Sequence, residues 1–563
     1  MMEHRAEIAA VEATAGFDAL VIGGGINGIS VFRDLALQGT SVLLVERGDF
    51  VSGASAASSH MVHGGVRYLE NGEFRLVRES VQERNRLLAN APHRVRPLQT
   101  TIPIRTATSG ILAAPLRMVT HRRVPKERGA ALIKLGLSIY DTFSRGGRLP
   151  RHRFLGRTAA HQELPALDPR FAFTATYFDA SMPDPERLAL DVLRDGIEDG
   201  GIALNYVEAI GARDGRVQLK DRITGRLFDV SASVIVNASG PWTDQTNDTL
   251  GVPTRYMGGT KGSHIVLDNP ELLEATHGRE IFFEHTDGRV VLIYPLHGRV
   301  LVGTTDLDAD ARQAAVCTED EVDYFFDLIA DVFPNIPADR SQIVYRFAGI
   351  RPLPRHDDVA PGFVSRDYRV VRGEVSGVPL LSLVGGKWTT FRALGEHLTD
   401  EVLRLLQRDR RSTTMRLKIG GGDGFPADDN TDEWIGTHLG DVDARRAKVL
   451  LERYGTRAVE AAAEIAACGD EDEVILGGAL STGELRYQIR HEHAFHLLDV
   501  LLRRTNLAFT GRVNAETIEI VGSAMQKAAG WDDARLNQEI EEAAVFLEDF
   551  HGLVLRTDHG VRL

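Results

Sequence analysis

Cysteine is almost absent from this chain. Only Cys317 and Cys468 occur among its 563 residues. Two cysteines are too few for a disulfide framework or for a zinc site with four ligands of this kind. Such low usage is typical of a reducing compartment, so we expect a cytoplasmic protein.

Long apolar runs are also missing. The most apolar windows, residues 110–119 and 130–140, are interrupted by Arg117 and Lys134. Both fall short of the roughly 20 apolar residues that cross a bilayer, so we expect no membrane span. Residues 1–16 contain three glutamates and no continuous apolar centre. They do not resemble a signal peptide, and we expect them to form a flexible leader.

Positive charge is in deficit, because 65 Lys and Arg face 79 Asp and Glu and the formal net charge is −14. A general nucleic-acid binder is therefore not expected, and a phosphate-bearing ligand must be met by local basic residues. One segment reverses this balance and could contact an anionic membrane surface. Between residues 105 and 134 a single acid, Glu127, accompanies seven basic residues: Arg105, Arg117, Arg122, Arg123, Lys126, Arg128 and Lys134.

The composition is that of a folded globular protein, with 43% hydrophobic and 26% charged residues. Short β-rich runs alternate with helical periodicity up to about residue 408, which predicts a mixed α/β body. Three long periodic segments follow, at residues 445–468, 487–504 and 515–547. We therefore predict an α/β region over residues 17–410 and a helical domain over residues 411–563.

Near the N-terminus, a β-rich run at residues 17–22 is followed by the motif G-x-G-x-x-G, made by Gly23, Gly25 and Gly28. A helical pattern and a second apolar run complete a βαβ unit. Such glycines allow a tight turn, close approach of the backbone to a pyrophosphate, and close packing of helix on strand. Glu46 lies 18 residues after Gly28, at the end of the second run, where a carboxylate can accept hydrogen bonds from a ribose. The unit predicts a dinucleotide site that suits NAD and FAD equally.

Further motifs decide between these cofactors. With the glycine motif and Asn27, they resemble the FAD-dependent glycerol-3-phosphate dehydrogenase family over nearly the whole chain. These motifs are Ser58-Ser59, His63-Gly64-Gly65-Val66-Arg67-Tyr68-Leu69-Glu70, Asn237-Ala238-Ser239-Gly240-Pro241-Trp242, Lys261-Gly262-Ser263-His264, Gly303-Thr304-Thr305-Asp306, Gly349-Ile350-Arg351-Pro352-Leu353 and Gly385-Gly386-Lys387-Trp388-Thr389-Thr390.

The resemblance implies a Rossmann-like FAD-binding domain interleaved with a mixed-sheet substrate domain. It also implies non-covalent FAD, oxidation of sn-glycerol 3-phosphate to dihydroxyacetone phosphate, and electron transfer to a quinone. A homodimer, attached peripherally to the inner face of the cell membrane, would suit this chemistry. The residues expected at the cofactor are Gly23, Gly25, Asn27, Gly28, Glu46, Ser58, Ser59, Gly240, Gly386 and Thr389, and those expected at the substrate are Arg67, Tyr68, His264, Arg351 and Lys387.

The chemistry of the substrate fits this set of residues. A small dianion needs fixed cations, which Arg supplies as a bidentate donor and Lys as a point charge. Its hydroxyl needs a proton acceptor, and His264 has the near-neutral pKa of a general base. Lys387 could bind the phosphate or stabilise reduced flavin, and both roles stay open.

Several alternatives remain at this level. The chain could be an oxidase that uses oxygen, a dehydrogenase of another polyol phosphate, or a non-catalytic flavin-binding protein, although the complete cationic set argues against the last. His63 lacks companions at metal-ligand spacing, so no metal site is expected. Residues 491–493, His-Glu-His, are expected to lie on a solvated helix face.

Overall fold

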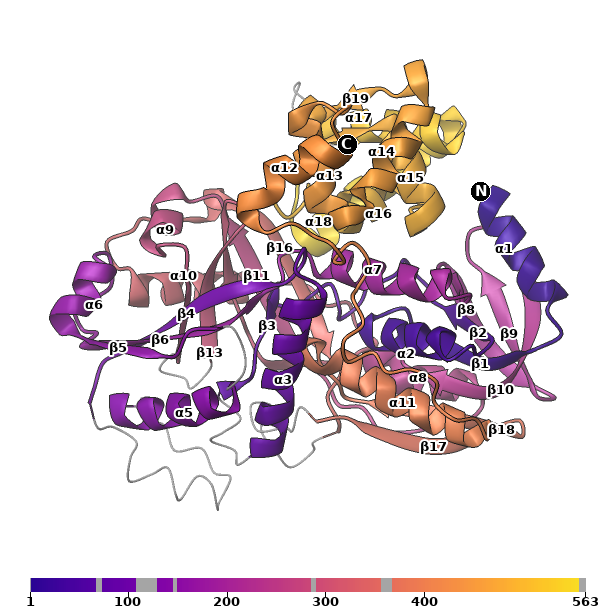
Figure 1. Ribbon diagram of the computed structural model, residues 1–563, viewed down its shortest axis with the longest axis horizontal. Coiled ribbons are helices and arrows are strands. Elements are labelled where there is room, and N and C mark those ends of the chain that lie inside the picture. Colours follow the sequence, from indigo (N-terminus) through magenta and orange to yellow (C-terminus); the bar gives the residue numbers. More distant parts are fainter. Residues whose placement is uncertain are drawn as a thin grey trace.

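The computed structural model describes residues 2–66, 73–107, 129–144, 149–284, 290–355 and 367–555. Two β-sheets stand side by side, and a cluster of C-terminal helices covers one end of both (Figure 1). This mixed α/β architecture with a C-terminal helical domain confirms the predicted fold class. The positions of the boundaries between the parts stay a prediction.

Within the described residues the first sheet has eight strands, in the order β17-β18-β10-β1-β2-β7, with β8 and β9 continuing from β10. From β18 to β7 the strands are parallel, and β17 is an antiparallel edge. Their continuous apolar runs suit a sheet that is covered on both faces. We call it the parallel sheet: β1 (Phe17–Ile22), β2 (Val42–Val45), β7 (Ile202–Leu204), β8 (Val207–Arg213), β9 (Arg216–Asp221), β10 (Leu227–Asn237), β17 (Arg369–Val375) and β18 (Val378–Val384).

Three helices cover one face of the parallel sheet: α2 (Ile26–Leu37), α7 (Pro185–Glu198) and α11 (Phe391–Leu405). The other face packs against the β8–β9 ribbon and the N-terminal helix α1 (Met2–Ala13). The prediction of a flexible leader is therefore wrong. Ile8 and Val11 lie three residues apart, on one side of α1, and both are buried against this face.

The second sheet mixes strand directions and has ten strands among the described residues, in the order β15-β11-β14-β13-β12-β4-β6-β3, with β16 on β11 and β5 on β6. We call it the mixed sheet. Its strands are β3 (Met61–Val62), β4 (Arg96–Ile104), β5 (Arg153–Gly156), β6 (Phe173–Ser181), β11 (Thr260–Leu267), β12 (Glu280–Glu284), β13 (Val290–Leu296), β14 (Arg299–Gly303), β15 (Leu307–Asp308) and β16 (Ile343–Arg351).

Different helices cover the two faces of the mixed sheet. The back is covered by α6 (Arg157–Glu163), α9 (Pro270–Ala275) and α10 (Glu319–Val332). The front is partly covered by α3 (Phe74–Asn90) and α5 (Ala130–Phe143). The front also carries His264 and is the face on which the candidate site lies. Helix α8 (Thr243–Thr249) follows the end of β10.

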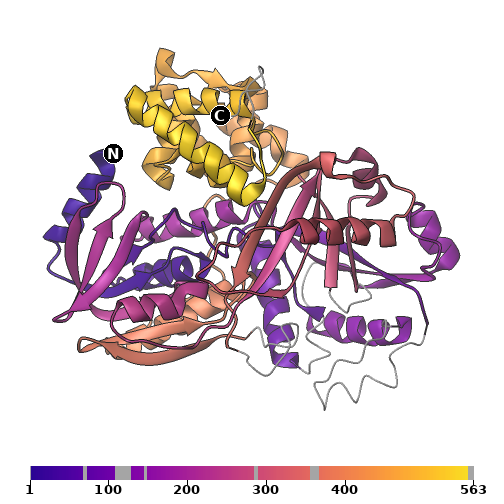
Figure 2. The same cartoon turned by 180° about the vertical axis from the view of Figure 1, so that it is seen from behind.

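The C-terminal domain consists of helices shorter than the sequence pattern predicts. Each of the three long periodic segments is split by a residue in the left-handed conformation: Gly455, His493 or Gly530. The elements are α12 (Thr431–His438), α13 (Ala444–Tyr454), α14 (Ala458–Ala467), β19 (Val474–Ile475), β20 (Leu480–Ser481), α15 (Thr482–Glu492), α16 (Leu497–Asp499), α17 (Ala515–Ala529) and α18 (Asp533–His551). Helix α18, yellow in Figure 2, ends against β16, where His551 stacks on Tyr345.

Of the helices that the structure describes, none combines the length and the apolar character needed to pass through a bilayer.

Candidate active site

The glycine motif forms a turn between β1 and α2 into which side chains do not fit. Gly23 has φ +115°, and a Cβ there would lie 2.7 Å from the carbonyl oxygen of Ala238. A Cβ on Gly28 would lie 1.9 Å from the carbonyl oxygen of Gly23. At Gly25, by contrast, a Cβ would meet only Ser55 Oγ, at 3.1 Å. Space is therefore open beside Gly25, at the helix N-terminus where amide groups and the helix dipole attract phosphate.

Glu46 stands beside this turn, at the end of β2. Its two carboxylate oxygens accept hydrogen bonds from the backbone N–H of Gly24, at 2.7 Å, and of Gly48, at 2.9 Å. Burial raises the pKa of Glu46 above its usual value, and these two hydrogen bonds act in the opposite direction. A carboxylate fixed in this way keeps lone pairs with which it can accept hydrogen bonds from a ribose.

A second glycine turn, after β18, faces the N-terminus of α2. Gly386 has φ +105°, and a Cβ there would lie 2.6 Å from Asn27 Nδ2. Asn27 Oδ1 is buried and has no hydrogen-bond partner among the described residues. The two turns and this amide oxygen form a cradle with an unsatisfied polar group, which fits a dinucleotide lying across the ends of β1 and β18. Gly240, with φ +62°, lies at the end of β10 between these two strands.

The loop after β2 contributes serines to both sheets. Ser55 Oγ accepts from the backbone N–H of Ile26 at 3.0 Å, and the Ser55 carbonyl accepts from Trp388 Nε1 at 2.9 Å. Ser59 Oγ is 2.9 Å from His264 Nε2, whereas Ser58 Oγ accepts from the backbone N–H of His60. This loop connects the cradle to the mixed sheet. Ser55 was not among the predicted site residues, although its Gly-Ser-rich surroundings were a usable signal.

His264 lies on β11, on the front of the mixed sheet, with only 2% of its surface exposed. Its ring stacks on Phe347 of β16 with centroids 4.8 Å apart. Nε2 interacts with Ser59, and Nδ1 is buried without a hydrogen-bond partner among the described residues. Burial, and next the positive charge of Arg351, lower the pKa of His264 well below its usual value. The imidazole is therefore neutral near pH 7 and can accept a proton.

Arg351 ends β16 beside His264. Nη1 pairs with Asp306 Oδ1 at 2.9 Å, and Nη2 donates to Thr304 Oγ1 and to the Thr305 carbonyl, each at 3.0 Å. These contacts fix the plane of the guanidinium. The motif Gly303–Asp306 thus supports Arg351, a role that the sequence did not reveal because the two segments are far apart along the chain.

Lys387 and Thr389 approach from the parallel sheet. Lys387 Nζ donates to Ser80 Oγ of α3 at 2.6 Å, and Thr389 Oγ1 donates to the His63 carbonyl at 3.1 Å. The structure thus places these two residues on the same turn as Gly386. Arg67 and Tyr68 lie outside the described residues.

The backbone just before Arg67 is held firmly. The N–H of Gly64 lies 3.0 Å from both Tyr140 Oη and Asp179 Oδ1, and Asp179 pairs with the fully buried Arg84. Helices α3 and α5 and strand β6 therefore position the segment that leads to Arg67. This polar cluster could not be predicted from the sequence, because its members come from separate elements.

An unpredicted acid lies on the same front face. Glu280 of β12 is fully buried, and its Oε2 accepts from Thr100 Oγ1 at 2.8 Å. Its Oε1 has no partner among the described residues. Burial raises the pKa of Glu280 to about 8, so the carboxyl is largely protonated at neutral pH.

Two other predictions can be compared with the structure. Residues 491–493 do not form a solvated face: Glu492 and His493 are buried, because Glu492 makes a bidentate ion pair with Arg187 and His493 turns inward at the end of α15.

In the basic segment, residues 108–128 lie outside the described part. Arg105 pairs with Asp331, and on α5 Lys134 and Leu135 are exposed.

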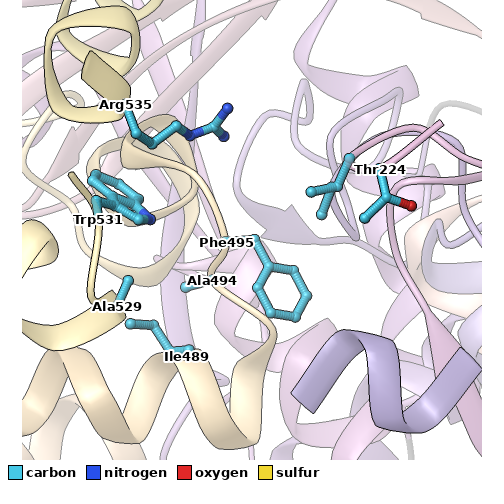
Figure 3. A pocket seen from close by; sticks show the side chains of 8 residues that line it. Thr224, Ile489, Ala494, Phe495, Ala529, Trp531 and Arg535 are labelled. Carbon is cyan, nitrogen blue, oxygen red and sulfur yellow. The ribbon is translucent and has the colours of Figure 1, made fainter. Parts of the chain in front are cut away.

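A separate pocket lies between the C-terminal domain and the turn that joins β9 to β10 (Figure 3). Trp531, Phe495 and Arg535 face Thr224 across it. None of the predicted site residues lines this pocket.

Comparisons with known proteins test the expected family and cofactor. Residues 18–400 match the family model of FAD dependent oxidoreductases, and residues 412–536 match the C-terminal domain of alpha-glycerophosphate oxidase. The glycerol-3-phosphate dehydrogenase of Synechocystis sp. is 32% identical over 556 residues, which cover 94% of this chain and 96% of the relative. The D-erythritol 1-phosphate dehydrogenase of Brucella abortus is 31% identical over 499 residues, covering 87% and 92%.

Among solved structures, glycerol-3-phosphate dehydrogenase from Bacillus halodurans, complexed with FAD, shares the fold with a TM-score of 0.75 and 23% identity, covering 97% of each chain. The chain belongs to the FAD-dependent oxidoreductases, in the group that contains the glycerol-3-phosphate dehydrogenases. It is a flavoenzyme, and its cofactor is FAD. The family and the cofactor expected from the motifs are thus confirmed.

Proposed function

We propose that this flavoenzyme oxidises sn-glycerol 3-phosphate to dihydroxyacetone phosphate and passes the electrons to a quinone. The observation that carries the proposal is that His264 and Arg351 lie on one face of the mixed sheet, and that Ser59, which contacts His264, belongs to the same loop as Ser55, which contacts the glycine turn. Lys387 directly follows Gly386 of the second glycine turn. This arrangement offers a neutral base and two cations to a small phosphorylated alcohol. Residues 17–410 would hold the flavin and the substrate, and residues 411–563 would form the helical domain.

The cations have different tasks in this proposal. Arg351 presents a guanidinium held by Asp306, Thr304 and the Thr305 carbonyl, which would supply a fixed positive charge to the substrate phosphate together with Arg67. Tyr68 lies next to Arg67 in the chain and would complete this side. Lys387 is a point charge on the turn of Gly386, so it can serve the phosphate or the pyrimidine edge of the flavin.

His264 would take the hydroxyl proton. Only one nitrogen of the neutral ring can accept a proton. We assign this role to Nε2, which lies 2.9 Å from Ser59 Oγ on the loop beside the glycine turn. The chemistry that FAD would supply when bound is acceptance of a hydride from C2. The residues proposed to hold it are Gly23, Gly25, Asn27, Gly28, Glu46, Ser58, Ser59, Gly240, Gly386 and Thr389.

The test is anaerobic mixing of the holoenzyme with glycerol 3-phosphate while flavin absorbance is followed. We expect rapid bleaching by glycerol 3-phosphate and very slow bleaching by glycerol. Equal rates with both alcohols would contradict the phosphate-binding role of the cations. Reoxidation by a quinone analogue, compared with peroxide formation in air, separates a dehydrogenase from an oxidase.

A second substrate deserves the same assay. The erythritol phosphate dehydrogenase is nearly as similar to this chain as the glycerol phosphate enzyme, at 31% against 32% identity. Faster bleaching by D-erythritol 1-phosphate than by glycerol 3-phosphate would assign the longer polyol phosphate as the substrate.

We further propose that the chain binds an anionic membrane surface through residues 105–140, since a quinone is lipid-soluble. Lys134 and Leu135 are exposed side by side on α5, which suits contact with headgroups and the interface, whereas Arg105 is paired. Cosedimentation with anionic vesicles tests this. The native chain should pellet at low salt, and a variant with Arg117, Arg122, Arg123 and Lys126 changed to Glu should not; equal pelleting would contradict the assignment. Light scattering of the same samples would test the proposed homodimer.

A further inference from the structure

The segment that presents Glu46 is anchored in the C-terminal domain, about 450 residues later in the sequence. Asp49, three residues after Glu46, is buried and accepts hydrogen bonds from Arg503 and from Arg504. Asn205 Nδ2 lies 2.9 Å from Asp49 Oδ1 and also donates to the His493 carbonyl at 2.9 Å. The loop after β2, Asn205 and the C-terminal domain are therefore joined through the carboxylate of Asp49.

A π-helical turn, Val500–Arg504, makes this contact possible. Consecutive residues of a regular helix point in different directions, yet Arg503 and Arg504 both reach Asp49. The wider turn ends where the Thr505 backbone N–H and hydroxyl both bond to the Val500 carbonyl, at 3.1 and 2.7 Å. Turns of this type are frequent at functional sites, which suggests that the arginine pair has a specific task.

The charges at this junction are balanced. Burial alone would raise the pKa of Asp49, but Arg504 and Arg503 lower it well below its usual value. Arg503 also pairs with Asp499, and Arg504 donates to the Glu492 carbonyl. Removal of the Asp49 charge would leave two buried guanidinium groups without their main acceptor, which is costly.

Hydrogen bonds also hold the short segment between Asp49 and Glu46, whose carboxylate is proposed to bind the cofactor. The N–H of Gly48 donates to Glu46 Oε1, and its carbonyl accepts from the N–H of Tyr206 at 2.9 Å. The Tyr206 hydroxyl donates to Asp499 Oδ1 at 2.6 Å, so this support also ends in the C-terminal domain.

The residues that follow Asp49 also contact the glycine turn. Phe50 is fully buried, lies edge-on to His493 with centroids 5.6 Å apart, and contacts the position where a Gly24 side chain would stand. The N–H of Val51 then donates to the Gly24 carbonyl at 2.9 Å.

We infer that Asp49, held by Arg503 and Arg504, is a positioning residue for FAD, and that the C-terminal domain thereby fixes the carboxylate proposed to bind the cofactor's ribose. This inference rests on the assignment of Glu46 to the cofactor. Asp49 itself does not touch the cofactor; it sets the position of Gly48 and Glu46 relative to the glycine turn.

The test compares four holoenzyme variants by the rate of FAD release on dilution, followed by flavin fluorescence, and by unfolding temperature with and without excess FAD. Asp49→Asn removes the anchor charge and Glu46→Gln changes the direct contact. Glu484→Gln is the matched control, because Glu484 is also a fully buried carboxylate that pairs with two arginines, Arg446 and Arg453, but lies wholly within the C-terminal domain.

We expect Asp49→Asn to release FAD about tenfold faster, as when groups that orient a direct ligand are lost at metal sites. Glu484→Gln should lower the unfolding temperature yet release FAD at the native rate. Arg503→Gln, which leaves Arg504 on Asp49, should show the same change as Asp49→Asn to a smaller extent and serves if Asp49→Asn does not fold.

Native FAD release in both Asp49→Asn and Arg503→Gln, with faster release in Glu46→Gln, would overturn the inference. Equal acceleration in Glu484→Gln would overturn it as well, since the effect would then be general destabilisation. Native release in Glu46→Gln would instead remove the assignment of Glu46 to the cofactor.

Discussion

The two sheets differ in how they present groups to their ligands. At the parallel sheet the main contributions come from backbone: glycine turns, helix N-terminal amides and one carboxylate fixed by amides. At the mixed sheet they come from side chains, namely His264 and Arg351, each supported by residues from other strands. The site at the parallel sheet needs glycines, which have no Cβ, whereas the site at the mixed sheet needs particular side chains. The following changes test that difference.

The largest effect should follow from adding a side chain at Gly25. Gly25→Val should abolish FAD retention while the protein still folds, because the new side chain meets only Ser55 Oγ in the protein but occupies the place proposed for pyrophosphate. Gly156→Val is a matched control: both glycines precede a helix with φ −80° and ψ 172°. Flavin content per chain, measured by absorbance, should fall only in the first variant, and full occupancy there would refute the cradle.

Loss of a side chain at the mixed sheet should leave flavin binding intact and strongly lower turnover. Arg351→Ala should lower kcat/KM for glycerol 3-phosphate by about 30-fold to several thousand-fold, because removing the cation from the proposed pair with the substrate phosphate costs about 2–5 kcal/mol. Arg346→Ala, on the same strand but paired with Glu319 at the surface, should change it little. Steady-state assays on flavin-loaded protein make the comparison, and similar losses in both variants would argue for a structural role.

The pH profile of flavin reduction examines His264. Because its pKa is lowered, its neutral form persists below pH 6.5, and the rate should fall only in more acidic solution. The apparent second-order rate constant at low substrate, from stopped-flow absorbance, reports the free enzyme. An acid limb at or above pH 6.5 would contradict this environment, and His264→Ala should remove the limb together with most of the rate.

The smallest effect concerns Glu280 and stability alone. Its pKa in the folded state, about 8, lies above its ordinary 4.5, so ionisation favours the unfolded chain as pH rises between these values. Relative to the native protein, Glu280→Gln should gain free energy of unfolding as the pH rises from 4.5 to 8. Denaturant titrations at both pH values, with the exposed Glu541→Gln as control, measure this. A constant difference would mean that Glu280 ionises normally.

Local patterns predicted much of the fold. The first strand, Phe17–Ile22, has the bounds expected from the sequence. The cofactor turn was equally accessible, since the conformations of Gly23 and Gly28 follow from a motif of six residues. Here the chemistry depends on neighbours along the chain, which a sequence displays directly.

What could not be predicted depends on distant segments. The support of Arg351 by Asp306, the polar cluster at Gly64 and the burial of Glu280 arise only when strands pair. The burial of Glu492 was missed for the same reason, because its partner Arg187 lies on α7. Helix α1 was missed because its two apolar contacts, Ile8 and Val11, are too few to stand out among glutamates.

The interleaving of the two sheets has a consequence for biosynthesis. Strand β1 enters the parallel sheet at residue 17, but its second neighbour on one side, β18, is not complete until residue 384, after every described strand of the mixed sheet has been made. The parallel sheet can therefore finish folding only after the described strands of the mixed sheet have been made. The nascent chain must keep the apolar edge of β10 unpaired while about 140 further residues emerge. We expect early encounters with chaperones, and a flavin that enters only after β18 has been made.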